Sequence, residues 1–235
     1  MEPLSQHGTM TDRATSALRA AILRGELEPS TLHAVHTVAE QLGVSRTPVR
    51  EALIRLSGEG LVRVHRNRGF VVLRHSPDDL CEIFSLRLLL EVPAARAAAT
   101  LAGPVDVAAL EADLTRMRDA MRRDDAERFL REDRQFHRTL LTISGNERLA
   151  EFVDSLRNVV LSSGVSTANR SESIEEILEP HLELLRLVRD HRAEEAAESM
   201  RHHLVQTAEK LLVQEFGLDA AAQFRAILDR LHIGR

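Results

Sequence analysis

Four side chains in the second half of this 235-residue chain are of the types that bind divalent metal ions. Asp133 and His137 are four residues apart, so on a helix they lie one turn apart on the same face. His181 and His203 follow later. Three neutral imidazoles and one carboxylate suit Zn²⁺, Ni²⁺ or Mn²⁺. Spacing alone leaves a second interpretation open, surface or core groups that bind no metal, since the chain has 11 histidines.

A second set of residues has the chemistry of DNA recognition. Gly43 can adopt the left-handed conformation that ends a helix, Ser45 is a candidate N-cap, and Pro48 suits the first turn of a new helix. These features predict a helix-turn-helix with a recognition helix from about Thr47 to Ser57. At its N-terminal end, side chains and backbone N–H groups can meet phosphates and base edges. The candidate DNA contacts there are Arg46, Thr47 and Arg50.

Two runs of alternating residues follow, Leu61–His65 and Phe70–Leu73, with Asn and Gly between them. This pattern predicts a β-hairpin. A hairpin directly after a helix-turn-helix is a wing, and a basic tip suits phosphates or a narrow minor groove. The alternative is a solvated basic turn without a ligand. The candidate DNA contacts in the wing are His65, Arg66, Arg68 and Gly69.

The remaining elements are expected to be helical. Two helices, at about 11–24 and 36–42, precede the recognition helix. After the wing, Ser76 is a cap and Pro77 the first residue of a helix that runs to about Leu101. Further helices are expected at about 105–122, 125–143, 147–163, 179–190, 193–216 and 218–232, with Pro180 at the start of its helix. The predicted fold is mainly α, an N-terminal winged helix-turn-helix followed by an all-helical bundle of six or seven helices.

The composition supports a helical, two-part protein. Hydrophobic residues make up 43% and aromatic residues only 3%, which favours helices over sheets. The net charge is −5, but residues 1–75 hold 10 Arg and 7 acidic residues, a net charge of +3, which leaves −8 for the rest. A basic N-terminal module joined to an acidic body is the expected organisation.

The cysteine count and hydropathy bear on the compartment. Cys81 is the only cysteine, so no internal disulfide can form, which fits a reducing cytoplasm. No apolar run approaches the roughly 18 residues that span a bilayer, and the N-terminus lacks a signal-peptide core. The sequence therefore predicts a cytoplasmic protein with no membrane partner.

The N-terminal module resembles the winged-helix domain of GntR-family bacterial transcription regulators. The likeness rests on Gly43–Leu53, Leu56, Glu59–Val62 and Arg68–Val72. It implies that the three recognition-helix residues face double-stranded operator DNA and that Gly69 lies where the wing approaches the minor groove. The chain departs from the family at His36, where an arginine is usual.

The body resembles the FCD effector domain of the FadR-type branch of that family. The likeness rests on Leu86-Arg87…Glu91, Asp133…His137, Glu179…Leu185 and Met200…Leu204. It implies a divalent cation held by Asp133, His137, His181 and His203, and a small carboxylate effector that completes the coordination. Arg87 is then the candidate to bind the carboxylate, and the alternative is a structural arginine paired with Glu91.

These expectations lead to a ligand-responsive transcription regulator of a metabolic operon. Residues 1–75 would bind DNA, and residues 76–235 would bind the effector and form a homodimer on a palindromic operator. Two alternatives remain open, a metal sensor without an organic effector and a metal-dependent hydrolase. The hydrolase is disfavoured because the sequence has no HExxH pair, no Gly-rich phosphate loop and no nucleophile elbow.

Overall fold

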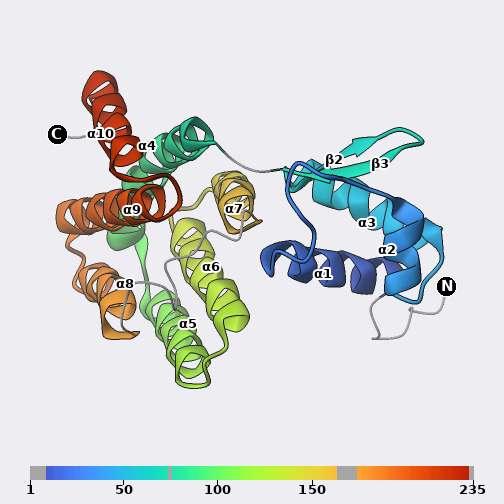
Figure 1. Cartoon of the computed structure of the whole chain (residues 1–235). Coiled ribbons are helices and arrows are strands. Elements are labelled where there is room, and N and C mark those ends of the chain that lie inside the picture. The colour runs from blue at the N-terminus through green and yellow to red at the C-terminus, as the bar shows by residue number, and fades with distance from the viewer. Residues whose placement is uncertain (1–8, 74–75, 163–173, 233–235) are drawn as a thin grey trace. The chain divides into compact units, whose positions relative to one another are not determined.

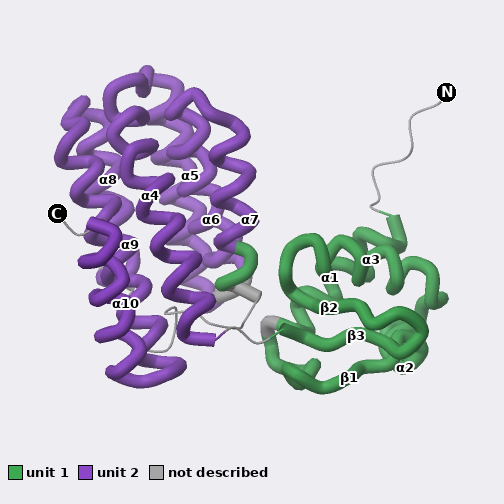
Figure 2. The backbone as a smooth tube through the Cα atoms, turned by 90° about the horizontal axis from the view of Figure 1, so that it is seen from above, with its two compact units in different colours: residues 1–75, 158–164 green, residues 76–157, 165–235 purple. Residues whose placement is uncertain are grey.

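The computed structural model describes residues 9–73, 76–162 and 174–232. It is mainly helical with one small sheet, which confirms the predicted fold class (Figure 1). The chain divides into two compact units (Figure 2): the smaller contains residues 1–75 and a short segment at 158–164, and the larger contains the rest. None of the helices in the described ranges is long and apolar enough to cross a membrane.

Three helices build the smaller unit: α1 (Met10–Leu23), α2 (Val35–Gln41) and α3 (Arg46–Gly58). A capping box starts α1, because the Thr9 amide donates to Asp12 Oδ2 at 2.8 Å and the Asp12 amide donates back to the Thr9 hydroxyl. α1 packs against α3, and the largest buried side chains of this core are Leu18, Leu53, Leu56, Leu61 and Phe70.

The turn between α2 and α3 has the predicted left-handed glycine, with a φ of 64° at Gly43. Ser45 occupies the N-cap position of α3, but its side chain makes no capping hydrogen bond. The first N–H groups of α3 therefore have no side-chain cap from Ser45, which leaves them available to an acceptor from outside the protein.

The sheet contains β1 (Leu32–His33), β2 (Val62–His65) and β3 (Gly69–Val72) in the order β1-β3-β2, and all pairings are antiparallel. The predicted hairpin is the β2–β3 pair. β1 was not predicted from the sequence, because two residues are too few to show an alternating pattern.

Gly69 has a structural reason to be glycine. Its φ is 137°, and a Cβ atom at this position would lie 2.1 Å from the backbone oxygen of His33 in β1. Gly69 is also buried, whereas the neighbouring arginines are exposed. The close approach of β1 therefore explains this residue without any contact to DNA.

The larger unit contains seven described helices, in agreement with the expected six or seven. Their bounds are α4 (Pro77–Leu101), α5 (Pro104–Arg122), α6 (Ala126–Ile143), α7 (Glu147–Ser162), α8 (Ile174–Arg189), α9 (Ala193–Phe216) and α10 (Leu218–Leu231). α4 is the central helix of this bundle and packs against α6, α8, α9 and α10. Its start is as predicted, with a capping box between Ser76 and Asp79 and a proline at the first position.

The start of α8 corrects one expectation. The helix begins at Ile174, so Pro180 lies in its interior and does not begin it. An interior proline costs about 3 kcal/mol, since it removes one backbone hydrogen bond. Ile177 and Leu178, in the turn before the proline, are buried. Burial of two such side chains stabilises by about 1.5–3 kcal/mol each, which outweighs the cost.

Candidate metal centre and DNA-binding face

Three histidines from three different helices meet inside the larger unit. His137 lies on α6, His181 on α8 and His203 on α9, and one ring nitrogen from each lies within 4.8 Å of the others. The rings of His137 and His203 are stacked with centroids 5.3 Å apart, and the ring of His181 stands across both. The bundle thus brings together residues separated by 66 positions in the sequence.

His137 presents a bare ring nitrogen to this cluster. It is fully buried, and its Nδ1 lies 3.1 Å from Glu91 Oε2. Burial opposes ionisation of Glu91, but the charge of Arg87 and the contact with His137 keep its pKa below the ordinary value. An ionised carboxylate only accepts, so Nδ1 donates. Nε2 is then an acceptor, and it has no hydrogen-bond partner among the described residues.

The protonation of His137 is consistent with this arrangement. Burial, and after it the charge of Arg157, lowers the pKa of His137 to about 4. The ring is therefore neutral at pH 7, as a metal ligand must be. Its Nδ1 contact with Glu91 is the kind of second contact that fixes the tautomer and orientation of a metal-binding histidine.

The Nε2 atom of His181 faces a carboxylate oxygen of Asp133. Its Nδ1 lies 2.9 Å from the carbonyl oxygen of Ile177, which only accepts, so Nδ1 carries the hydrogen. Nε2 lies 2.9 Å from Asp133 Oδ1. Although burial opposes it, the charge of Arg157 holds the pKa of Asp133 well below its ordinary range. Two acceptors at this distance repel each other unless a proton or a metal cation lies between them.

His203 completes the set. It is partly exposed, whereas His202 beside it on α9 is exposed. Burial of its ring, followed by the nearby His181 and His137, holds the pKa of His203 well below 6.5. The residues present fit the divalent cation that the resemblance implies, because Nε2 of His137 lacks a partner among the described residues and the facing His181 Nε2 and Asp133 Oδ1 could both bind one cation.

The guanidinium of Arg87 already has partners within the protein. It is buried, its Nε donates to Glu91 Oε1 at 2.6 Å, and its guanidinium carbon lies 4.8 Å from the centroid of the Phe84 ring. Of the two interpretations of Arg87 given by the sequence, this geometry favours the structural one.

Arg157 on α7 is a second buried arginine at the same site. Its Nη2 donates to Asp133 Oδ2, and its Nη1 lies 3.9 Å from Glu91 Oε2. Its Nε and Nη1 have no hydrogen-bond partner within the described part of the chain. Sequence reasoning missed Arg157, although a cation at helical spacing between the apolar Val153 and Val160 was a usable signal.

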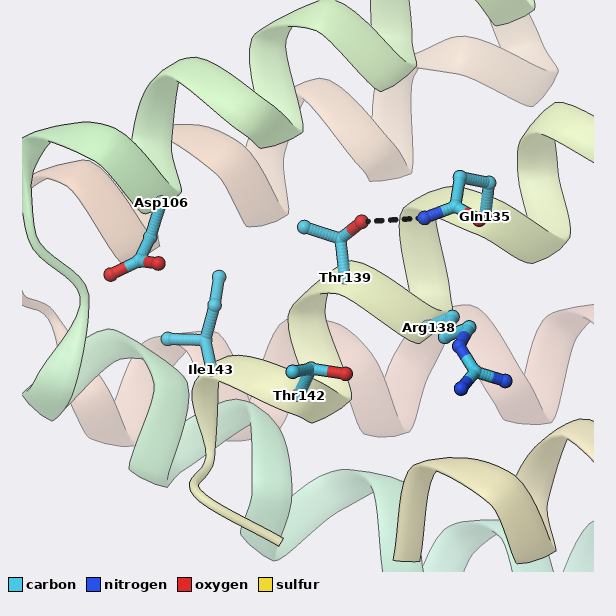
Figure 3. Close-up of a pocket in the computed structure, with 6 residues that line it drawn as sticks. All are labelled: Asp106, Gln135, Arg138, Thr139, Thr142 and Ile143. Carbon is cyan, nitrogen blue, oxygen red and sulfur yellow. Dashed lines mark hydrogen bonds between the residues drawn. The ribbon is translucent and has the colours of Figure 1, made fainter. Parts of the chain in front are cut away.

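A polar hollow of about 250 Å³ lies on the opposite face of α6 from His137. It is lined by Asp106, Gln135, Arg138, Thr139, Thr142 and Ile143 (Figure 3). Gln135 donates to the Thr139 hydroxyl at 3.1 Å, Thr139 donates to Asp113, and Arg138 donates to Glu147. These donors are already used within the bundle, so the hollow is not a candidate site.

The predicted DNA-contacting residues of α3 lie on its exposed side. Arg46, Thr47 and Arg50 are all exposed. By contrast, Arg55 near the end of α3 pairs with Asp12 at 2.7 Å. No ion pair of Arg46 or Arg50 is found among residues 9–73 or the other described ranges. The cations at the start of α3 are therefore left for an external anion.

The tip of the wing also carries exposed arginines. Arg66 and Arg68 are exposed, His65 is partly exposed, and the tip is closed by a hydrogen bond from the Arg68 amide to the His65 carbonyl at 3.1 Å. Within the described ranges neither arginine has an ion-pair partner. One residue that the sequence did not single out joins this face: Ile54, one turn after Arg50, is 66% exposed. An exposed apolar side chain there can contact thymine methyl groups.

Two family profiles match this chain. The profile of the bacterial regulatory proteins of the gntR family matches residues 10–72, and that of the FCD domain matches residues 82–206. The chain belongs to the GntR family. Its GntR profile contains the α3 and wing arginines, and its FCD profile contains all four candidate metal ligands.

Two relatives of this GntR-family protein are named as regulators of operons. The Nta operon transcriptional regulator of Aminobacter aminovorans is 31% identical over 74% of this chain and 81% of its own length. The gluconate operon transcriptional repressor of Bacillus subtilis is 30% identical over 72% of this chain and 71% of its own length. The solved structure of E. coli McbR/YncC covers 88% of this chain and 99% of that chain, with a TM-score of 0.72 and 26% identity.

These relatives confirm the predicted class. The protein is a DNA-binding transcription regulator of the GntR family and not an enzyme.

Proposed function

We propose that this GntR-family regulator responds to a small organic acid bound beside a divalent cation in its helical unit. Residues 1–75 form the DNA-binding domain, and residues 76–235 form the effector-binding and dimerisation domain. The observation that carries the proposal is the place where the three histidines meet, because Nε2 of His137 and two N–H-bearing nitrogens of Arg157 are buried there without hydrogen-bond partners in the described chain.

In this proposal Asp133, His137, His181 and His203 hold the cation. The nitrogen-rich set favours Zn²⁺, Ni²⁺ or Mn²⁺ over Mg²⁺ or Ca²⁺, which prefer oxygen ligands. A bound cation would take the place of a proton between His181 Nε2 and Asp133 Oδ1 and would give His137 Nε2 a partner. It also supplies a positive charge to attract an anionic ligand.

The chemistry of the site favours a carboxylate as that ligand. Arg157 has two buried nitrogens, Nε and Nη1, without hydrogen-bond partners in the described chain, and a carboxylate oxygen can accept a charge-assisted hydrogen bond from either of them. Arg87 is less suited because Glu91 already accepts from it. We therefore assign the carboxylate contact to Arg157 and give Arg87 a supporting role.

The property that the effector would change is the affinity of the protein for operator DNA. A homodimer would present two α3 helices to successive major grooves of an operator, with the wing arginines on the flanking phosphates or minor groove. A coupling free energy of about 1–3 kcal/mol between effector site and DNA site gives a change of roughly 5–150-fold in DNA affinity.

Metal analysis tests the site directly. His137→Ala and His203→Ala should lose the metal stoichiometry of the wild type, while His202→Ala, the exposed neighbour of His203, should retain it. A wild-type metal content in the first two variants would remove the site.

A thermal-shift screen of sugar acids, hydroxy acids and dicarboxylates then tests the effector. An acid that binds only the folded protein raises its Tm. A shift with the metal and with none of the acids would favour a metal-sensing regulator.

A further inference from the structure

The central helix α4 leaves one stripe of its surface uncovered. Glu82, Leu86, Leu89, Pro93 and Arg96 recur every three or four residues and therefore lie on one face. All five are exposed, with Leu86 at 41% and Leu89 at 53%. The other positions of α4 supply 12 buried residues to the bundle. A large exposed apolar side chain is common by itself, but aligned ones flanked by charges mark an interaction surface.

The charges at the ends of this stripe are placed symmetrically. Glu82 and Arg96 each lie seven residues from Leu89, which is about 10 Å along a helix. If two copies of α4 pair in an antiparallel manner about a two-fold axis at Leu89, each Glu82 meets Arg96 of the partner subunit. Leu86 then approaches Pro93 of the partner subunit, and the two Leu89 side chains meet on the axis. A foreign partner would not require such symmetry, whereas a second copy does.

Arg96 can donate to this second carboxylate. Its Nε and Nη2 donate to Glu194 of the same chain at 2.9 Å and 2.7 Å, which leaves Nη1 for another acceptor. The pairing also fixes how the helices cross. A crossing near 20° keeps residues seven positions from the axis in contact, whereas a crossing near 50° separates them.

We propose that the α4 stripe, Glu82, Leu86, Leu89, Pro93 and Arg96, is the centre of an interface with a second copy of this chain. The proposal rests on the dimer suggested above and names the surface that forms it. It requires nothing of the metal, the effector or the DNA.

Sedimentation equilibrium of the full chain tests the apolar centre. The wild type should have twice the monomer mass of 26.3 kDa. Leu89→Arg places two like charges on the axis and should raise the dimer dissociation constant at least about tenfold, as expected for a central interface residue. Val105→Arg, at a side chain that is 82% exposed on α5, is the matched control and should stay dimeric.

Exchanging the charges of Glu82 and Arg96 tests the ends of the stripe. The comparison uses several variants, so it does not fail if one of them folds poorly. Glu82→Arg and Arg96→Glu should each weaken the dimer, and the double variant Glu82→Arg/Arg96→Glu should restore it. Glu194→Ala removes the partner of Arg96 within the chain and should leave the dimer unchanged.

The outcomes separate the interface from the proposed function. A monomeric wild type would overturn the dimer itself. A dimeric wild type with equally dimeric Leu89→Arg, Glu82→Arg and Arg96→Glu variants would overturn this interface and leave the regulator proposal standing. Restoration by the charge exchange supports the antiparallel pairing, and a double variant weaker than both single ones would contradict it.

Discussion

Buried charges beside the histidines are connected in a short chain of contacts. Arg87 donates to Glu91 Oε1, and Glu91 Oε2 accepts from His137 Nδ1. Arg87 thus acts on His137 through Glu91, since it stabilises the ionised carboxylate that sets the tautomer of the ring. This relay accounts for the burial of Arg87 without any contact between Arg87 and an effector.

Glu91→Gln should break this relay. Glu91 accepts from Arg87 and from His137 with separate oxygens, and glutamine keeps only one acceptor oxygen, so the orientation of His137 is weakened and affinity for Zn²⁺ should fall about 10–100-fold. Arg87 would also be left buried without a counter-charge, at a cost of about 3–5 kcal/mol in unfolding free energy. Competition with a chelating dye measures the first effect, and urea unfolding the second.

Glu194→Gln is the control for this change. Glu194 pairs with Arg96 at the surface, where its side chain is 77% exposed, so both quantities should stay near those of the wild type. A folded Glu91→Gln variant with wild-type zinc affinity would contradict the relay.

Cys81 offers a pH-dependent measure of folding. Burial, followed by the charge of Asp78, raises the pKa of its thiol to about 11, against about 8.5 for an exposed cysteine. Above pH 8.5 the unfolded chain loses the thiol proton and the folded chain keeps it, so this group lowers stability as pH rises from about 8.5 to 11.

At pH 8, iodoacetamide should therefore label native protein at least about 200-fold more slowly than guanidinium-unfolded protein, since the thiolate is the reactive form. Native labelling as fast as unfolded labelling would show that Cys81 is accessible.

The residue types of the candidate metal site were predictable from the sequence, but part of their chemistry was not. Asp133, His137, His181 and His203 were chosen on spacing and family likeness, and three helices bring the histidines together. The facing acceptors at His181 and Asp133 depend on side-chain positions that spacing does not contain. Arg157 was missed because an arginine among apolar residues of a helix is usually read as a snorkelling surface group.

At the scale of elements, α3 separates its charges between two tasks. Arg55 is neutralised by Asp12 and helps to hold α1, whereas Arg50 is exposed without an ion-pair partner in the described chain. Arg50→Ala should weaken binding to operator DNA by about 1–3 kcal/mol, or roughly 5–150-fold, because a base or phosphate contact is lost.

Arg55→Ala is the matched control on the same helix, and it should change DNA affinity little. Fluorescence anisotropy with labelled DNA from beside the gene measures both variants. Equal losses for Arg50 and Arg55 would indicate general electrostatic attraction and would contradict a specific recognition face.

The elements whose ends are marked by capping residues or glycine could be predicted from the sequence. The Ser76–Pro77 start of α4 and the Gly43 turn agree with the sequence because capping and left-handed glycine are local properties. β1 and the first turn of α8 depend on partners far away in sequence. β1 exists through its pairing with β3, and α8 extends before Pro180 because Ile177 and Leu178 are buried.

For the whole molecule, the proposed regulation rests on a separation of tasks between two units. The smaller unit holds the exposed arginines of α3 and the wing, and the larger holds the histidines, Asp133 and Arg157. An effector can change DNA affinity only if it binds the DNA-competent and DNA-incompetent states with different affinity. The bundle site must therefore influence the DNA-binding unit for the proposed function to hold.

The decisive measurement is the affinity of the full-length protein for operator DNA with the bundle site filled and emptied. Anisotropy titrations would compare the metal-free protein, the metal-loaded protein, and the metal-loaded protein with each acid that raises its Tm. We expect one of these additions to change the Kd of the wild type by about 5–150-fold, and we expect no such change for His137→Ala. An identical wild-type Kd in all three states, with metal and acid demonstrably bound, would contradict regulation through the bundle site.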